Sequence, residues 1–170
     1  INYKGTVTLT AKTTMRVLEE IAESLIRAGI NALLMASTHG GNQFLMEVVA
    51  RNLRVKGMHT FCKTVRSSMS NVRYGDNHAG EYETSVMMTL GDDYVKKDTM
   101  DPQSVESYRK RAALVNTRTE GTQAWIADDV MVHGVCGDPY EATLEKGMAW
   151  VEEERKGLVK LMEEIAKVAF

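Results

Sequence analysis

Two short polar clusters in this sequence carry the side-chain types that a hydrolytic site uses. The first, Ala36-Ser37-Thr38-His39-Gly40-Gly41-Asn42, has one imidazole before two glycines. The second, residues 76–85, contains His78 and the carboxylates of Asp76, Glu81 and Glu83. Because imidazole and carboxylate groups bind divalent metal ions and transfer protons, the two clusters predict one shared hydrolytic site.

The first cluster follows an apolar run, residues 32–35, whose lack of polar alternation predicts a strand buried on both faces. His39 therefore lies at the carboxyl end of a strand, where open α/β sheets place their sites. Gly40 and Gly41 allow a close backbone approach at a helix start, whose amides can hold an oxyanion or an acidic ligand. A histidine hydrogen-bonded within a glycine turn is the alternative interpretation.

The second cluster opens a predicted helix over residues 79–90. Glu83 shares its face with apolar residues, so its carboxylate needs a partner, either a metal ion or an arginine. Glu81 lies about 160° from the centre of that face, at roughly 100° per residue, and is predicted to be solvated. His78 is either a site residue or a residue at the helix start that bonds to local backbone.

The other histidines and the cysteines add less. His59, inside a predicted strand, is interpreted as a core or edge residue. His133, in a turn before Gly134, is interpreted equally well as a site residue or as a structural residue. Cys62 and Cys136 are too few for a disulfide framework; we interpret them as buried apolar side chains in a reducing, cytoplasmic protein.

The elements that must position these residues alternate between strands and helices. A strand at 6–9, a helix at 13–28 and a second strand at 30–37 follow one another and imply a parallel pair with a right-handed crossover, and therefore an α/β fold. Strands are predicted at 6–9, 30–37, 58–65 and 130–132. Helices are predicted at 13–28, 42–56 and 79–90, at 104–113 within a polar segment over 91–123, and from Pro139 to the C-terminus. Thr13 and Asn42 are the predicted caps of the first two helices, and Gly29 is predicted to end the first.

Length and composition exclude several classes of protein. At 170 residues with 44% hydrophobic content, the chain can bury the core of one domain. The net charge of −2 argues against a broad electrostatic surface for nucleic acid or an anionic membrane. Since no apolar run approaches the roughly 20 residues that cross a bilayer, we expect neither a nucleic-acid nor a membrane partner.

Three ordered motifs together resemble the creatininase family, the creatinine amidohydrolase-like metal hydrolases. They are Thr38-His39-Gly40-Gly41-Asn42, His78-Ala79-Gly80-Glu81-Tyr82-Glu83-Thr84-Ser85, and Gly137-Asp138-Pro139 with Ala142-Thr143 and Glu145-Lys146-Gly147. The resemblance covers essentially the whole chain. It implies a three-layer α/β/α sandwich with a mainly parallel sheet, of which residues 1–170 would be the C-terminal portion of a single domain whose N-terminal part is missing here.

The resemblance also implies an activity. Family members hold two divalent metal ions, zinc, manganese or iron, and hydrolyse a carbon–nitrogen bond other than a peptide bond with a metal-activated water. By motif position, His39 and Glu83 would be metal ligands, and His78 would contact the substrate and assist proton transfer. The residues expected to bind substrate or support the ligands are Gly40, Gly41, Asn42, Tyr74 and Asp76.

Two differences from creatininase proper bear on the substrate. Creatininase has a tyrosine and a ligating glutamate where this chain has Gly40 and Gly41, and by ungapped counting Tyr74 stands where it has a flap tryptophan. The resemblance is therefore to the family's glycine-glycine branch, which includes deformylases of pterin- and flavin-type biosynthesis and peptide-processing members. We expect an amide, cyclic amide or formamide substrate and leave its identity open.

A further difference concerns the ligand set. The family takes additional ligands from a Glu-x-His motif and an aspartate in its N-terminal third, whereas no histidine precedes His39 here and the chain starts at Ile1, in mid-structure. We expect a companion N-terminal chain that carries these ligands, in a homo- or hetero-oligomer of the hexamer type. The alternatives are a metal-free structural or binding subunit that retains the fold, and a nucleotide-binding module whose Gly40-Gly41 turn lacks an adjacent Lys or Arg.

Overall fold

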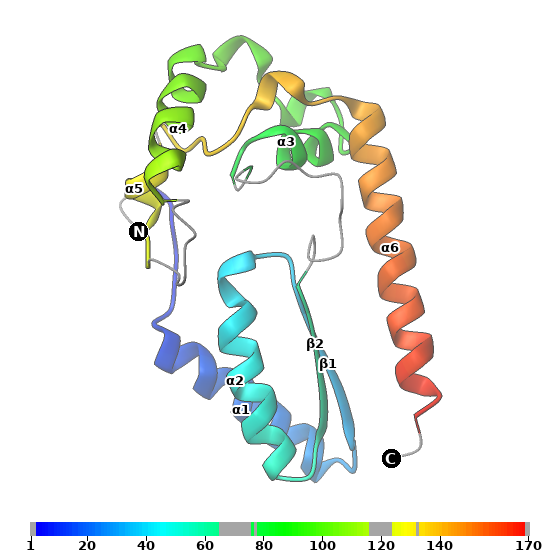
Figure 1. Cartoon of the computed structure of the whole chain (residues 1–170). Coiled ribbons are helices and arrows are strands. Elements are labelled where there is room, and N and C mark those ends of the chain that lie inside the picture. Colours follow the sequence, from blue (N-terminus) through cyan, green and yellow to red (C-terminus); the bar gives the residue numbers. More distant parts are fainter. Residues whose placement is uncertain (1–2, 65–75, 77, 116–123, 132, 169–170) are drawn as a thin grey trace. The chain divides into compact units, whose positions relative to one another are not determined.

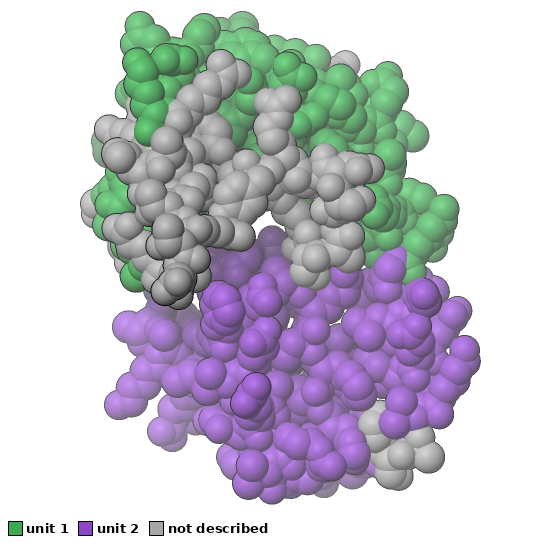
Figure 2. All heavy atoms as spheres, viewed as in Figure 1, with its two compact units in different colours: residues 1–6, 70–156 green, residues 7–69, 157–170 purple. Residues whose placement is uncertain are grey.

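The computed structural model describes residues 3–64, 76, 78–115, 124–131 and 133–168, and Figure 1 shows the course of the chain. Two compact units are distinguished by colour in Figure 2. Unit 1 comprises residues 1–6 and 70–156, and unit 2 comprises residues 7–69 and 157–170. None of the described helices is long and apolar enough to cross a bilayer.

Unit 2 contains one parallel pair, formed by the two strands that the sequence predicts at 30–37 and 58–65. The parallel pair predicted between residues 6–9 and 30–37 is wrong, because residues 6–9 form no strand. Strands β1 (Ala32–Ser37) and β2 (His59–Thr64) pair in parallel, with a register that runs from Ala32 opposite His59 to Ser37 opposite Thr64. Between them lie a 3-10 turn, η1 (Gly40–Asn42), and helix α2 (Gln43–Val55). The prediction that β1 is buried on both faces is wrong for part of its length, since Ala36 is exposed and Met35 is the one residue of the strand that is buried.

The N-terminal segment of unit 2 differs from the prediction at two places. Residues 6–9 form no strand and are exposed. Helix α1 (Ala11–Arg27) begins before Thr13, because the side chain of Thr10 accepts a hydrogen bond from the Thr13 amide at 3.2 Å and caps the helix. Its end is as predicted, since Gly29 has a φ of +83°, which suits glycine.

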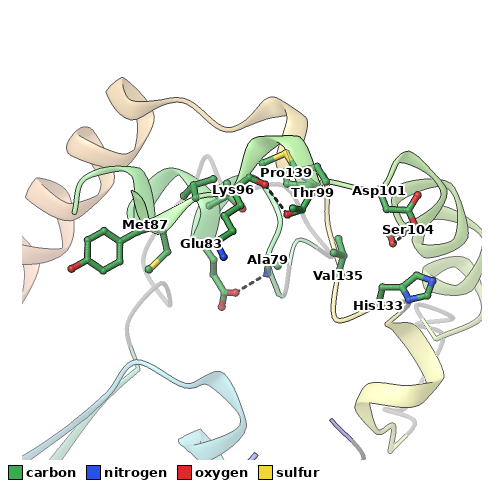
Figure 3. A pocket seen from close by; sticks show the side chains of 14 residues that line it. Ala79, Glu83, Met87, Lys96, Thr99, Asp101, Ser104, His133, Val135 and Pro139 are labelled. Carbon is green, nitrogen blue, oxygen red and sulfur yellow. Dashed lines mark hydrogen bonds between the residues drawn. The ribbon is translucent and has the colours of Figure 1, made fainter. Parts of the chain in front are cut away.

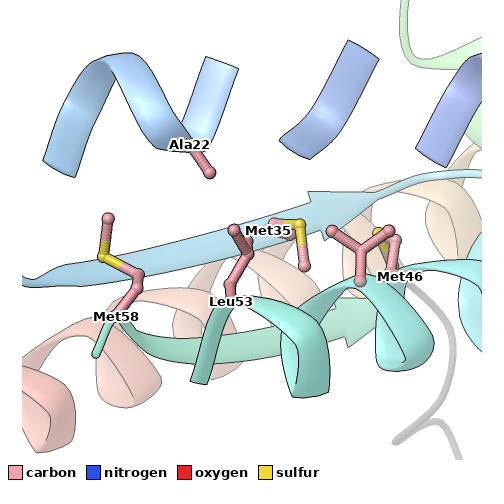
Figure 4. Close-up of a cluster of buried hydrophobic side chains, with 6 residues drawn as sticks. Ala22, Met35, Met46, Leu53 and Met58 are labelled. Carbon is pink, nitrogen blue, oxygen red and sulfur yellow. The ribbon is translucent and has the colours of Figure 1, made fainter. Parts of the chain in front are cut away.

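An apolar core joins α1, α2 and the two strands of unit 2. Figure 4 shows methionine side chains from both strand and helix meeting in this cluster. Three of the chain's methionines are buried in it, where a flexible side chain fills irregular space, whereas Met148 and Met162 are exposed. The buried members are Ala22, Met35, Met46, Val49, Leu53 and Met58.

Unit 1 is built from short helices and turns. Its helices are α3 (Glu81–Met88), α4 (Pro102–Val115), α5 (Ala127–Val130) and the first part of α6 (Leu144–Ala166). Its 3-10 turns are η2 (Asp92–Tyr94), η3 (Lys97–Thr99) and η4 (Pro139–Glu141). The residues of α6 from 157 onward belong to unit 2. The predicted short helix at 104–113 is therefore longer at both ends. The Asp101 carboxylate accepts the Gln103 amide at 2.9 Å, which satisfies a backbone donor of the first turn.

Two predicted elements of unit 1 are wrong. A strand was expected at 130–132, yet Val130 ends α5, where the Asp129 carboxylate holds the Ile126 amide at 2.8 Å; Val132 lies outside the described residues. The final helix was expected from Pro139, yet Pro139 opens the separate turn η4, capped by Asp138 through the Tyr140 amide at 3.1 Å. In both cases a local carboxylate-to-amide bond stabilises a turn that apolar periodicity does not reveal.

Candidate functional site

The turn that presents His39 is organised by the hydroxyl of Ser37, at the end of β1. Ser37 Oγ accepts hydrogen bonds from the His39 amide and from Asn42 Nδ2, both at 3.1 Å, and donates to the His39 carbonyl at 3.2 Å. One donor and two acceptor positions of the hydroxyl are thus engaged. Asn42 is bonded to Ser37 and caps no helix amide, which corrects the predicted cap. Ser37 belongs to the first cluster, and the preference of serine to hydrogen-bond the backbone two residues on is the signal in the sequence for this bond.

The second glycine of the turn makes room for the imidazole. A Cβ on Gly41 would lie 2.6 Å from His39 Nε2, whereas a Cβ on Gly40 would meet nothing within 4 Å. A side chain at position 41 would therefore displace the exposed His39 ring, while one at position 40 would not. Only the second of the two glycines is required for the present position of the ring.

In unit 1, Asp76 anchors the start of α3. It is 3% exposed, and its two carboxylate oxygens accept the amides of Glu81 at 2.9 Å and Tyr82 at 2.8 Å. These amides belong to the first turn of the helix, where they have no partner within the helix and where a negative charge is favourable. Asp76 is thus placed to hold the helix that carries Glu83. This position favours a supporting role for Asp76 over contact with a substrate.

Close backbone packing surrounds this carboxylate. A Cβ added to Gly80 or to Gly137 would overlap Asp76 Oδ1, and each would also lie within 3 Å of the other glycine's Cα. His78 and Cys136 form an antiparallel bridge beside them, with N–H to C=O distances of 3.1 and 2.7 Å. The second and third sequence motifs therefore meet within unit 1, with two glycines in contact and the His78 backbone bonded in both directions.

Glu83 lies in the first turn of α3, half-buried, and its Oε2 accepts the amide of Ala79 at 2.8 Å. The prediction that Glu81 is solvated is wrong, because its side chain is 15% exposed and forms a salt bridge with Lys146 Nζ at 2.6 Å. Helix periodicity could not reveal this partner, which comes from the start of α6. The motif residue Lys146 therefore binds a carboxylate of α3 within unit 1.

A cavity of about 420 Å³ adjoins Glu83 within unit 1. Figure 3 shows Glu83 hydrogen-bonded to Ala79 in the middle of this cavity's lining, with His133, Asp101 and Ser104 to the right in the view. Met87, Val135 and Pro139 contribute apolar surface to the wall of the cavity. His133, whose role the sequence leaves undecided, is an exposed residue in the lining of this cavity.

The remaining predicted residues divide between the two units. Asp76, His78 and Glu83 occupy one short segment of unit 1, whereas His39, Gly40, Gly41 and Asn42 belong to unit 2; Tyr74 lies outside the described residues. Within the described residues, neither unit by itself gathers three histidine, cysteine or acidic side chains in an arrangement that could hold a metal ion.

Both cysteines are free thiols, as expected. Cys136 is buried, whereas Cys62 is only half-buried beside the core of unit 2. Burial, and secondarily the negative charge of Glu47, raises the pKa of the Cys62 thiol. A raised pKa makes Cys62 a poor nucleophile at neutral pH and argues against a reactive role.

Comparison with known proteins decides the family. A family model described as creatininase, creatinine amidohydrolase, matches residues 1–162. The chain belongs to the creatininase family. This creatininase-family chain is 27% identical over 146 residues to the mycofactocin precursor peptide peptidase of Mycobacterium ulcerans, a match that covers 86% of the chain and 53% of that protein. It thus spans about half the length of this curated relative.

Solved structures show the same fold. A putative creatinine amidohydrolase from Bacteroides fragilis is 26% identical, with a TM-score of 0.76 over 99% of this chain and 67% of that one. A mutant creatininase of the Zn-Zn type is 18% identical, with a TM-score of 0.71 over 98% of this chain and 69% of that one. The predicted creatininase-like α/β fold is therefore confirmed.

Proposed function

We propose that this creatininase-family chain supplies part of a dinuclear metal site that hydrolyses an amide, cyclic amide or formamide bond. The observation that carries the proposal is the position of Glu83, whose carboxylate is held by the Ala79 amide beside a cavity and close in sequence to His78. Membership of the creatininase family supports the reaction class. Two-zinc occupancy in a related creatininase supports a divalent metal.

The chemistry of the available donors fits a metal ion in part. His39 offers an exposed imidazole above Gly41, and Glu83 offers a half-buried carboxylate. Imidazole nitrogen and carboxylate oxygen are common ligands of zinc and manganese. Since neither unit gathers three such donors among its described residues, a companion N-terminal chain supplying the other ligands forms part of the proposal.

Each residue of the site has a proposed task. A divalent metal bound there would lower the pKa of a water molecule and polarise the scissile carbonyl. His39 and Glu83 would hold the metal, and His78 would pass a proton to the departing nitrogen. Asp76 holds the first turn of α3 and so keeps Glu83 in place. Gly41 would allow the His39 ring to keep its position, and Gly40, Asn42 and Tyr74 would border the substrate.

The setting of the enzyme also belongs to the proposal. We infer a cytoplasmic oligomer of the hexamer type, made with the companion chain. The two free thiols of the described structure suit a reducing compartment. A metal-free scaffold that retains the fold remains the second candidate, favoured by the absence of a three-donor metal cluster within either unit's described residues.

Native mass spectrometry with elemental analysis tests this proposal on protein purified from its source. We expect this chain with a second chain, and one to two divalent ions per pair. Glu83→Gln should lower the metal content, whereas the matched variant Glu81→Gln, two residues away and paired with Lys146, should retain it. Protein without metal, or equal metal loss in both variants, would contradict the enzyme and favour the scaffold.

A further inference from the structure

The cavity of unit 1 combines apolar walls with a small number of charged groups. Met87, Met100, Val135 and Pro139 supply apolar surface. Its volume of about 420 Å³ lies within the roughly 300–1,000 Å³ of small-molecule pockets, which are mostly apolar with a few polar groups that orient the ligand. The cavity therefore has the size and lining of a binding site for an organic molecule with an apolar body.

The acidic groups of the cavity accept hydrogen bonds from the protein itself. Glu83 accepts the Ala79 amide, and Asp101 accepts the Gln103 amide at 2.9 Å and the Ser104 hydroxyl at 3.2 Å. Ser104 is fully buried, so this last contact is part of the protein interior. Lys96, which also lines the cavity, forms no salt bridge with the described residues. Its ammonium group is thus available to an anionic ligand.

The backbone around the cavity carries conformational strain. Ala79 has a φ of +49° and His133 a φ of +53°; they are the two non-glycine residues with positive φ in the described part of the chain, and both line this cavity. Left-handed backbone at residues other than glycine is unfavourable and clusters at binding sites, where the surrounding structure maintains it. The positive φ angles at Ala79 and His133 are an observation separate from the charge of Lys96, and they also favour a binding site at this cavity.

We propose that this cavity binds a carboxylate attached to an apolar body, with Lys96 as the residue that selects the carboxylate. The apolar wall takes the body of the ligand, and the Lys96 ammonium takes its negative charge. If the proposed function holds, this ligand is the part of the amide substrate next to the bond that is cleaved. The binding itself requires neither metal nor catalysis.

A pair of probes tests the selection. N-acetyl-L-leucine and N-acetyl-L-leucinamide share an apolar body and differ in the carboxylate. We expect the purified protein to bind the acid about two- to fivefold more tightly than the amide, as suits one partly exposed ion pair. The preference should disappear in Lys96→Met and persist in Lys97→Met, a matched change at the neighbouring lysine of η3, which does not line the cavity.

The location is tested by methyl NMR of the methionines. Met87 and Met100 should shift on addition of N-acetyl-L-leucine, whereas Met35 and Met58 in the core of unit 2 should not. Equal affinity for the two probes, equal effects of the two lysine variants, or shifts confined to unit 2 would overturn the proposal. A carboxylate preference that depends on Lys96 in protein lacking metal would leave this site standing while the proposed hydrolase fails.

Discussion

The two units of this chain are stabilised in different ways. In unit 2, regular helices pack on a parallel strand pair through a cluster of apolar side chains that includes Val49 and Leu53, both fully buried. In unit 1, about half of the buried side chains among the described residues are polar, namely Asp76, Thr84, Ser85 and Ser104 beside Val105, Cys136, Pro139 and Trp150. Hydrogen bonds of carboxylates and hydroxyls to backbone amides do in unit 1 much of what apolar packing does in unit 2.

Close backbone contacts are a second difference between the two units. In unit 1, Gly147 of α6 lies against the backbone of Ser85 in α3, and Ser85 Oγ accepts the Thr143 amide at 3.1 Å. The rings of Tyr82 and Trp150 pack beside them, with centroids 5.4 Å apart. Unit 1 should therefore tolerate no added methyl group at such contacts, whereas unit 2 should be sensitive chiefly to removal of apolar volume.

The largest effect is expected from opening the core of unit 2. Leu53→Ala should lower the free energy of unfolding by about 2–5 kcal/mol, because Leu53 is 0% exposed and its loss leaves a cavity. Hydrogen exchange followed by mass spectrometry should show faster exchange in β1 and β2. The control is Val55→Ala on the same helix, which is 90% exposed and should change stability by about 0.5 kcal/mol or less.

A smaller effect is expected from one methyl group in unit 1. Gly147→Ala should cost about 1–3 kcal/mol, because the new Cβ overlaps the Ser85 carbonyl, and Trp150 fluorescence in urea should report it. Gly157→Ala on the same helix meets nothing within 4 Å and should gain about 0.5–1 kcal/mol in helix propensity. Equal effects at the two positions would contradict the difference we draw between the units.

Asp76→Asn should cost about 1–2 kcal/mol, since an amide side chain has one oxygen for the two helix amides that Asp76 now accepts. Exchange of the Glu81 and Tyr82 amides should increase before that of unit 2. Asp98→Asn, at an exposed position in η3, should have little effect. If Asp76→Asn left exchange in α3 unchanged, the proposed anchoring role would be wrong.

The smallest effect concerns pH in unit 2. Because burial raises the pKa of Cys62, less thiolate exists at a given pH, and alkylation by iodoacetamide should reach half its maximal rate at a higher pH than in the denatured chain. The protonated thiol is favoured by the folded state, so its contribution to stability is present at lower pH and lost as pH rises through the raised pKa. A midpoint at or below that of the denatured chain would contradict this.

The difference between the units also explains which predictions succeeded. Apolar periodicity predicted α1, α2 and the two strands β1 and β2, because unit 2 is stabilised by the faces that periodicity reports. It gave the wrong partner for β1, which pairs with β2 and not with residues 6–9. It failed for α5 and for the start of α6, where Asp129 and Asp138 stabilise turns through single bonds to backbone amides. Such bonds depend on local geometry, which the pattern of apolar residues does not encode.

For the candidate site, the sequence by itself determined the residue types, their order and the family. His39, His78 and Glu83 were identified from motif position, and their roles stay predictions. Tertiary structure alone decided that Glu81 pairs with Lys146, that Asp76 holds the first turn of α3, and that Glu83 borders a cavity with Lys96 and His133. The physical reason is that the Glu81–Lys146 pair and the cavity join residues from different elements, and that the Asp76 bonds depend on the turn before α3. None of these contacts follows from spacing along one helix or strand.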